Sequence, residues 1–154
     1  MIVDASLVVD AVCDPGRRGV AARGALGEQP PSEPLIAPGH FAFEIMSALR
    51  AASNRPDHPF QPANLSSALQ DAESYEITIE GTPWADVHRA WELSEHSLRY
   101  ADAVYVAAAE RHHTALLTTD GRIERSGAPA RCQIITVVPA VNDPLGETGD
   151  VTAP

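Results

Sequence analysis

Two short apolar segments that each end in an aspartate constrain the fold of this 154-residue chain most. In residues 1–6, Asp4 follows a β-branched pair directly, and in residues 114–122 an apolar run passes through hydroxyl side chains to Asp120. Continuous apolar runs are typical of strands covered on both faces of a sheet. Because ligands bind at the carboxyl ends of parallel strands, we expect the two aspartates to mark a functional edge.

Asp4 also has a simpler interpretation as a helix cap. A helix is expected to begin near Ser6, and aspartate is a preferred N-cap residue. Asp102, at the start of another predicted helix, has the same alternative, which the helix dipole favours. From these positions alone, a cap and a site are comparable interpretations of Asp4, so the rest of the chain has to decide.

Strands alternate with helices along the sequence, which predicts an α/β fold with a mostly parallel central sheet between helical layers. The chain length predicts one domain, which we place at residues 1–138, followed by a loosely attached tail at 139–154 that is rich in Pro, Gly, Asp and Thr. The expected strands are residues 1–3, 35–37, 75–79, 115–118 and 134–138, and the expected helices are 6–12, 17–26, 40–53, 63–74, one opened by Thr82 and Pro83, and 103–109.

The charge and the cysteines exclude several kinds of protein. The formal net charge is −10 and all eleven basic residues are arginine, so mechanisms that need a lysine are absent. An acidic chain is also unsuited to coating nucleic acid broadly. Cys13 and Cys132 lie far apart in the sequence, and neither has a Cys or His neighbour at the spacing of zinc ligands. Both are expected to be free thiols. With no apolar run long enough to span a bilayer and no signal peptide pattern, we expect a soluble cytoplasmic protein.

Two further acids lie on predicted helices beside packed faces. Glu44 is at the edge of an apolar stripe, where a carboxylate either reaches solvent or has an internal partner. Asp102 begins a helix that is apolar all round and is therefore expected to be central. On the preceding helix, Trp84 and Trp91 are expected to pack, while Asp86 is expected to face water.

If Asp4 and Asp120 end neighbouring strands, Glu44 and Asp102 can converge on the same edge. Four carboxylates without a lysine need a cation, because like charges at short range disfavour ionisation. Oxygen-only ligands indicate Mg²⁺ or Mn²⁺. The reaction that suits such a site is phosphodiester hydrolysis by a metal-activated water.

Four segments follow one another along the chain: Val3–Ser6, Glu44–Arg50, Tyr100–Ala107 and Leu117–Arg122. In this order they resemble the motifs of PIN-domain ribonucleases, most closely the VapC toxins of bacterial toxin-antitoxin pairs. The resemblance implies a three-layer α/β/α PIN fold over residues 1–138, with Asp4, Glu44, Asp102 and Asp120 as catalytic and metal-binding acids. It also implies that Ser6 and Thr118 are hydroxyl groups that orient the carboxylates.

The same resemblance implies a homodimer, a VapB-like antitoxin as partner and a tRNA or rRNA substrate. One departure from the family pattern is Ala101, which stands between Tyr100 and Asp102 where the tyrosine usually precedes the aspartate directly, and it leaves the role of Tyr100 open. Arg99 and Arg122 lie closest in sequence to the acids and are candidates for phosphate contact, with a solvated surface role as the alternative.

Other functions stay open at this point. A PIN-like scaffold that binds protein or RNA without catalysis is one, because a fold alone does not fix function. A metal-dependent nuclease acting on DNA is another. A phosphotransfer role with Asp4 as nucleophile is less favoured. One class of such proteins uses a lysine, which this chain lacks, and another has a second acid at the position of Ser6.

Overall fold

The computed structural model describes residues 1–30, 32–56 and 58–140. Within this part of the chain, short strands alternate with helices, as the sequence predicts. The elements are β1 (Ile2–Val3), α1 (Ala5–Cys13), α2 (Arg17–Gly27), β2 (Ile36–Pro38), α3 (Phe41–Ser53), a 3₁₀ turn (Pro62–Asn64), α4 (Leu65–Glu73), β3 (Thr78–Glu80), α5 (Trp84–Ser94), α6 (Tyr100–Arg111), β4 (Leu116–Thr118), α7 (Gly121–Arg125) and β5 (Ile134–Thr136).

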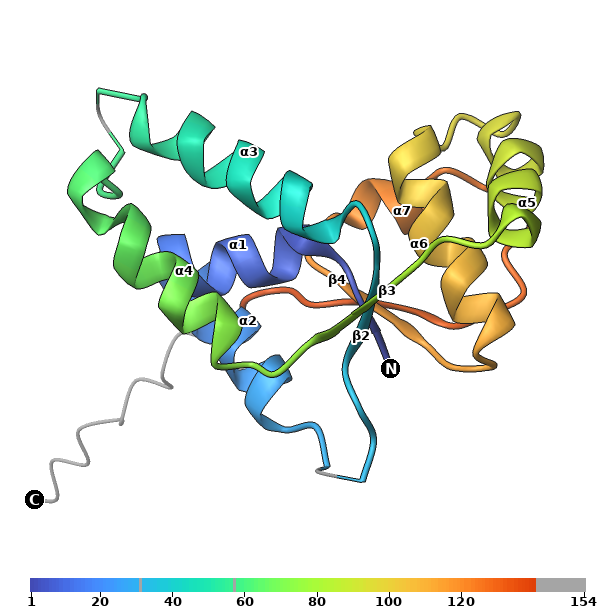
Figure 1. Cartoon of the computed structure of the whole chain (residues 1–154), viewed down its shortest axis with the longest axis horizontal. Coiled ribbons are helices and arrows are strands. Elements are labelled where there is room, and N and C mark those ends of the chain that lie inside the picture. The colour runs from blue at the N-terminus through green and yellow to red at the C-terminus, as the bar shows by residue number, and fades with distance from the viewer. Residues whose placement is uncertain (31, 57, 141–154) are drawn as a thin grey trace, which may run out of the picture.

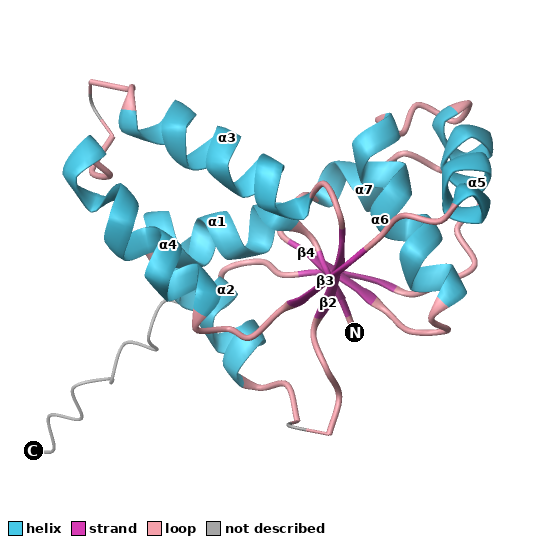
Figure 2. Ribbon diagram, in the orientation of Figure 1, coloured by secondary structure: helices cyan, strands magenta, loops and turns pink. Residues whose placement is uncertain are grey.

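The strands form one fully parallel sheet in the order β3-β2-β1-β4-β5. Helices α1 to α4 lie on one side of the sheet, and α5 and α6 lie on the other (Figures 1 and 2). This arrangement confirms the predicted α/β/α sandwich. From β1 the chain moves outward through β2 and β3 and then returns to the opposite side of β1 as β4, so the strand order reverses between β1 and β4.

The core is centred on β1, β4 and α6. Ile2 and Val3 are fully buried, and in β1 they pair with Leu116 and Leu117 of β4. Every residue of α6 from Asp102 to Ala109 is buried, which confirms the prediction of a central helix. The continuous apolar pattern of these segments therefore reflects their burial on both sides.

Helix α5 differs from the sequence prediction in which face it buries. Trp84 and Trp91 are exposed, while Asp86 is buried, where its carboxylate accepts hydrogen bonds from Arg111 of α6 at 2.9 and 3.1 Å. The inward face carries the small Ala90 and also Leu93, so it fits closely against α6, and an ion pair replaces the expected aromatic contact. A threonine before a proline at a helix start also predicts a hydroxyl cap from Thr82, but Pro83 is the N-cap and no side chain accepts a hydrogen bond there.

The remaining differences concern the ends of elements. The strand expected at 75–79 is shorter, because Glu76 has a left-handed backbone with φ of 53°, and pairing begins only at Thr78. The predicted tail at 139–154 lies, beyond Ala140, outside the described residues, so the domain boundary stays a prediction. Both cysteines are free thiols. Among the described helices, none is both long and apolar enough to cross a membrane.

Candidate active site

The four predicted acids line one pocket of about 700 Å³ at the carboxyl ends of β1 and β4. Asp4 follows β1 directly, and its backbone N–H donates to the carbonyl of Leu117 in β4 at 3.0 Å. Asp120 lies two residues after β4, and Glu44 and Asp102 come from α3 and α6. The pocket therefore lies where the strand order reverses, which is the usual binding position in an open parallel sheet.

All four acids stand at the N-terminal ends of helices. Asp4 and Asp120 are the N-caps of α1 and α7, where their side chains accept hydrogen bonds from the backbone N–H groups of Ser6 and Arg122. Glu44 and Asp102 lie in the first turns of α3 and α6. Asp4 is thus a helix cap that also lines the pocket, and the positive ends of helix dipoles favour the carboxylates.

Two hydroxyl groups hold the buried Asp4 carboxylate. Ser6 Oγ donates to Asp4 Oδ2 at 2.6 Å, and Thr118 Oγ1 donates to the same oxygen at 2.5 Å. Burial raises the pKa of Asp4, and these hydrogen bonds oppose that rise without cancelling it. Ser6 and Thr118 therefore occupy the positions predicted for orienting groups.

Glu44 has an internal partner, which was one of the two possibilities left open by its position. The buried Tyr105 hydroxyl donates to Glu44 Oε2 at 2.7 Å, and His40 Nε2 lies 3.6 Å from the same oxygen. Burial, together with the nearby charges of Asp4 and Glu44, raises the pKa of Tyr105, so its hydroxyl stays protonated and remains a donor.

Arginine side chains pair with the other two acids. Arg99 donates to both oxygens of Asp102, through Nε at 2.7 Å and Nη2 at 2.8 Å, and Nη2 also reaches Asp120 Oδ2 at 3.4 Å. Arg122 donates to both oxygens of Asp120, with Nε at 2.8 and 3.0 Å. Hydrogen bonds from Arg122 lower the pKa of Asp120. The two arginines therefore neutralise part of the acidic pocket.

Sequence reasoning missed several residues of this pocket. Asp10 is one: it faces the pocket, accepts a hydrogen bond from Thr119 and pairs with Arg18 at 2.9 Å. Tyr105, a buried residue that contacts the pocket's Glu44, was missed as well. Arg55, two residues after the end of α3, lines the pocket too. None of these could be singled out earlier, because each depends on contacts between distant segments.

The donor chemistry of the pocket fits Mg²⁺ or Mn²⁺, since it offers five carboxylates, those of the four predicted acids and of Asp10, and no sulfur. As the side chains stand in the described ranges, no three His, Cys, Asp or Glu groups are close enough to hold an ion. The guanidinium of Arg99, a cation, already lies between Asp102 and Asp120. The acids of the pocket thus suit a cation, and in this structure the Arg99 guanidinium is the cation between two of them.

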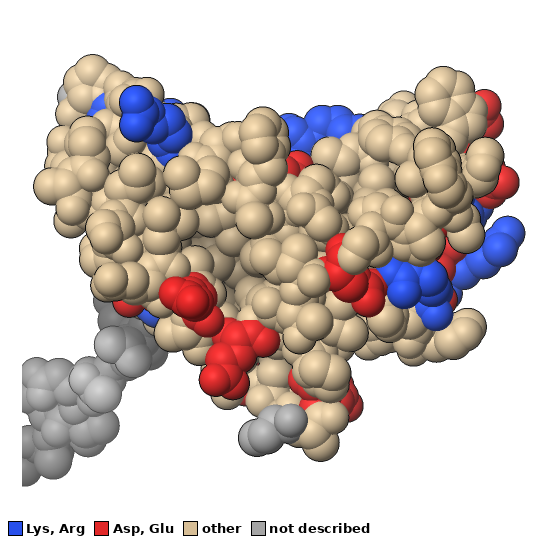
Figure 3. Space-filling view, in the orientation of Figure 1, with Lys and Arg blue, Asp and Glu red and all other residues tan. Residues whose placement is uncertain are grey.

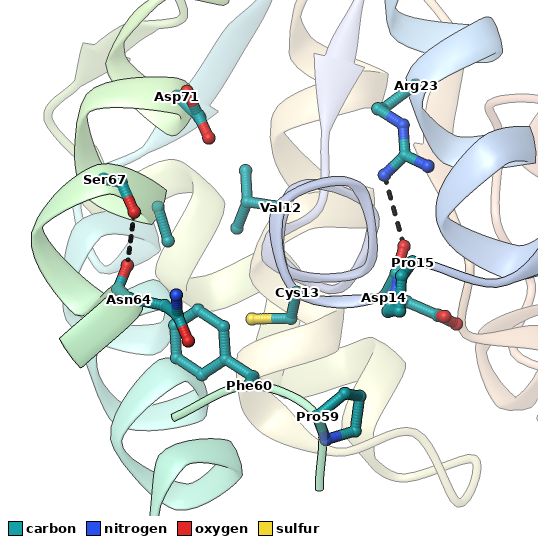
Figure 4. A pocket seen from close by; sticks show the side chains of 11 residues that line it. Val12, Cys13, Asp14, Pro15, Arg23, Pro59, Phe60, Asn64, Ser67 and Asp71 are labelled. Carbon is teal, nitrogen blue, oxygen red and sulfur yellow. Dashed lines mark hydrogen bonds between the residues drawn. The ribbon is translucent and has the colours of Figure 1, made fainter. Parts of the chain in front are cut away.

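A second cavity, of about 340 Å³, lies at the far end of α1 and lacks a comparable set of groups. Figure 4 shows Cys13 facing Phe60 across this space, and Arg23 donating to the Asp14 carbonyl at 3.2 Å. Burial, followed by the nearby carboxylates of Asp10 and Asp14, raises the pKa of the Cys13 thiol to about 11. The thiol therefore stays protonated at neutral pH and is no candidate nucleophile.

The sequence of the chain is similar to known proteins along most of its length. The family model described as PIN domain matches residues 1–128. Ribonuclease VapC3 of Mycobacterium tuberculosis is 32% identical over 126 residues, which cover 82% of this chain and 86% of that protein. Ribonuclease VapC1 of the same organism is 30% identical over 137 residues, covering 87% of this chain and 96% of that protein.

Solved structures share the fold at lower identity. The crystal structure of Mycobacterium tuberculosis VapC20, a Sarcin-Ricin loop cleaving toxin, has a TM-score of 0.63 at 17% identity and covers 82% of this chain and 95% of its own. A toxin-antitoxin complex from Klebsiella pneumoniae has a TM-score of 0.62 at 21% identity, and the match covers 90% of this chain and 98% of that one.

Proposed function

The chain belongs to the PIN-domain family, among its VapC-type toxins, and from this premise we propose that it is a metal-dependent endoribonuclease that acts as the toxin of a toxin-antitoxin pair. The observation that carries the proposal is the convergence of Asp4, Glu44, Asp102 and Asp120 on one pocket from four separate helix starts. The name ribonuclease, carried by relatives of at least 30% identity, supports RNA cleavage.

In this proposal the four acids hold Mg²⁺ or Mn²⁺. When bound, such an ion lowers the pKa of a water and offsets the charge that develops on the phosphate. The protein's own groups fix the carboxylates: Ser6 and Thr118 hold Asp4, and the Tyr105 hydroxyl holds Glu44. Groups that orient a metal ligand in this way typically affect metal affinity or activity about 10- to 100-fold.

Arginines of the pocket supply the cationic groups that an RNA backbone needs. Arg18, Arg55, Arg99 and Arg122 all line it, although the whole chain carries a net charge of −10. The face shown in Figure 3 has separate groups of arginines rather than a continuous basic surface. RNA is therefore expected to bind locally, through few phosphates, with Arg99 and Arg122 as contacts beside the reacting bond. The tRNA or rRNA class of the substrate rests on the resemblance alone.

The proposal extends to partners and location. As a VapC-type toxin, the protein is expected to form a homodimer in the cytoplasm and to bind a VapB-like antitoxin. The acidic charge of the chain suits a basic segment on that partner. Light scattering of the purified chain tests the dimer, and co-purification with the product of the adjacent gene tests the antitoxin. A monomer that ignores that product contradicts the toxin role.

Nuclease assays on single-stranded RNA and DNA, with Mg²⁺ and with excess EDTA, test the reaction. We expect cleavage of RNA that stops in EDTA. Cleavage of DNA alone supports the alternative of a DNA nuclease, and cleavage in EDTA contradicts the metal mechanism. RNA binding without cleavage at any Mg²⁺ or Mn²⁺ concentration supports a non-catalytic scaffold.

A further inference from the structure

Arg99 occupies an unusual position among the acids of the pocket. Its guanidinium engages both oxygens of the buried Asp102 and reaches Asp120, although its own side chain is 61% exposed. Arg99 is the residue just before α6, three positions before Asp102, so the two side chains can pair within the first turn of the helix. A paired, bidentate guanidinium is among the stronger contacts that a carboxylate can make.

A divalent ion and Arg99 require the same oxygens. An ion that binds Asp102 must take an oxygen that Arg99 now contacts, since both are engaged. A second cation at hydrogen-bond distance from the same carboxylate would also repel the metal. The Arg99 side chain is largely exposed, which gives the guanidinium an open route away from Asp102, whereas Asp102 itself is buried.

We propose that Arg99 is a resident counter-ion that competes with the metal: it neutralises Asp102 and Asp120 in the metal-free protein and leaves when Mg²⁺ or Mn²⁺ binds. This inference rests on the proposed function. It accounts for the side-chain arrangement, in which no three acids of the described ranges are gathered closely enough to hold an ion while the arginine is in place. Arg99 thus sets the metal concentration at which the pocket fills.

Titration calorimetry with Mn²⁺ tests the competition without measuring cleavage. The proteins are the full chain made by cell-free synthesis, Arg99→Gln, Arg99→Lys, and the control Arg50→Gln, which removes one positive charge from an exposed position of α3 outside the pocket. We expect Arg99→Gln to bind Mn²⁺ about three- to fivefold more tightly than the unchanged chain, as loss of a partly exposed ion pair would give. Arg99→Lys, which keeps the charge but loses the planar fork, should lie between them.

Thermal unfolding provides a second readout. Without its counter-ion, Arg99→Gln should melt lower than the unchanged chain in EDTA and gain more from saturating Mn²⁺. Equal Mn²⁺ affinities for Arg99→Gln, Arg50→Gln and the unchanged chain would overturn the competition and leave the proposed function standing. If none of the proteins binds Mn²⁺ at millimolar concentration, the metal mechanism itself is wrong, and the competition is wrong with it.

Discussion

Replacing Asp4 by Asn should abolish RNA cleavage and at the same time stabilise the metal-free protein. Asn is as good an N-cap as Asp, so one oxygen can still accept from the Ser6 backbone N–H. Its amide group can face the hydroxyls of Ser6 and Thr118, which can rotate to accept. The substitution therefore keeps the shape of the site and removes only the buried charge.

The stability change follows from two opposing effects. Hydrogen bonds to a charged acceptor are worth roughly 1 kcal/mol more than those to a neutral one, so three of them favour Asp4 by about 3 kcal/mol. Burying a charge costs several kcal/mol. The raised pKa of Asp4 indicates that burial outweighs the hydrogen bonds. We expect a net gain of about 1 kcal/mol for Asp4→Asn at pH 7, or roughly 2–4 °C in melting temperature.

The pH dependence gives the sign of this effect. A carboxyl whose pKa is higher in the folded state than in the unfolded state makes stability fall as the pH rises from the ordinary value of 3.8 through the folded value. Urea unfolding in EDTA should therefore show Asp4→Asn and the unchanged chain converging below about pH 4 and separating toward neutrality.

Cleavage of RNA in Mg²⁺ is the functional half of the test, and a loss of about 100-fold or more is expected, since even groups that only orient a metal ligand contribute up to that much. Glu95→Gln is the charge control, because Glu95 is exposed at the end of α5. Asp86, predicted to be on the solvent face, cannot serve because it is buried. A destabilised Asp4→Asn protein at pH 7, or one that cleaves at the unchanged rate, refutes this reasoning.

Three further predictions concern contacts around and behind the pocket. Tyr105→Phe removes the donor to Glu44 and should cost about 1 kcal/mol of stability and about tenfold in Mn²⁺ affinity by calorimetry; an unchanged affinity excludes a positioning role. Asp86→Asn breaks the pair with Arg111 and should lower the free energy of unfolding in urea by about 2–3 kcal/mol while leaving RNA cleavage unchanged in folded protein. Burial alone would raise the pKa of Glu110, but hydrogen bonds from its partners lower it, so its stabilisation should be lost as the pH falls below about 4.5, and Glu110→Gln should flatten that acid limb of the stability profile.

The sequence was sufficient to predict the layers of the fold and the convergence of the acids, because both follow from local patterns. An apolar strand that ends in an acid before a helix places that acid at one edge of a parallel sheet, whatever the rest of the chain does. This pattern placed Asp4 and Asp120 correctly. Glu44 and Asp102 followed from helical spacing and from the family resemblance.

Contacts that join distant segments could not be predicted in this way. Tyr105 and Glu44 lie 61 residues apart in sequence, and they meet because α3 begins just after β2, the strand against which α6 packs. The buried face of α5 was predicted wrongly because Trp84 and Trp91 carry more apolar surface than Ala90, yet a small residue permits closer packing against α6. The small side chain of Ala90 and the ion pair between Asp86 and Arg111 determine which face of α5 is buried. Hydrophobicity alone represents neither of them.

The geometry of the pocket explains how so many acids can coexist before any ion binds. In a parallel α/β fold each strand leads into a helix, so the carboxyl edge of the sheet is also the edge at which helix N-termini gather. Each N-terminus favours a nearby carboxylate by about 0.3–1 kcal/mol, and Arg99 and Arg122 add complementary charge. The fold itself therefore compensates these acids, enough to lower the pKa of Asp120 but only in part for Asp4, whose pKa stays raised by burial. On the proposed mechanism, a divalent ion would compete with existing stabilising contacts, and its affinity would measure only the difference between the two arrangements.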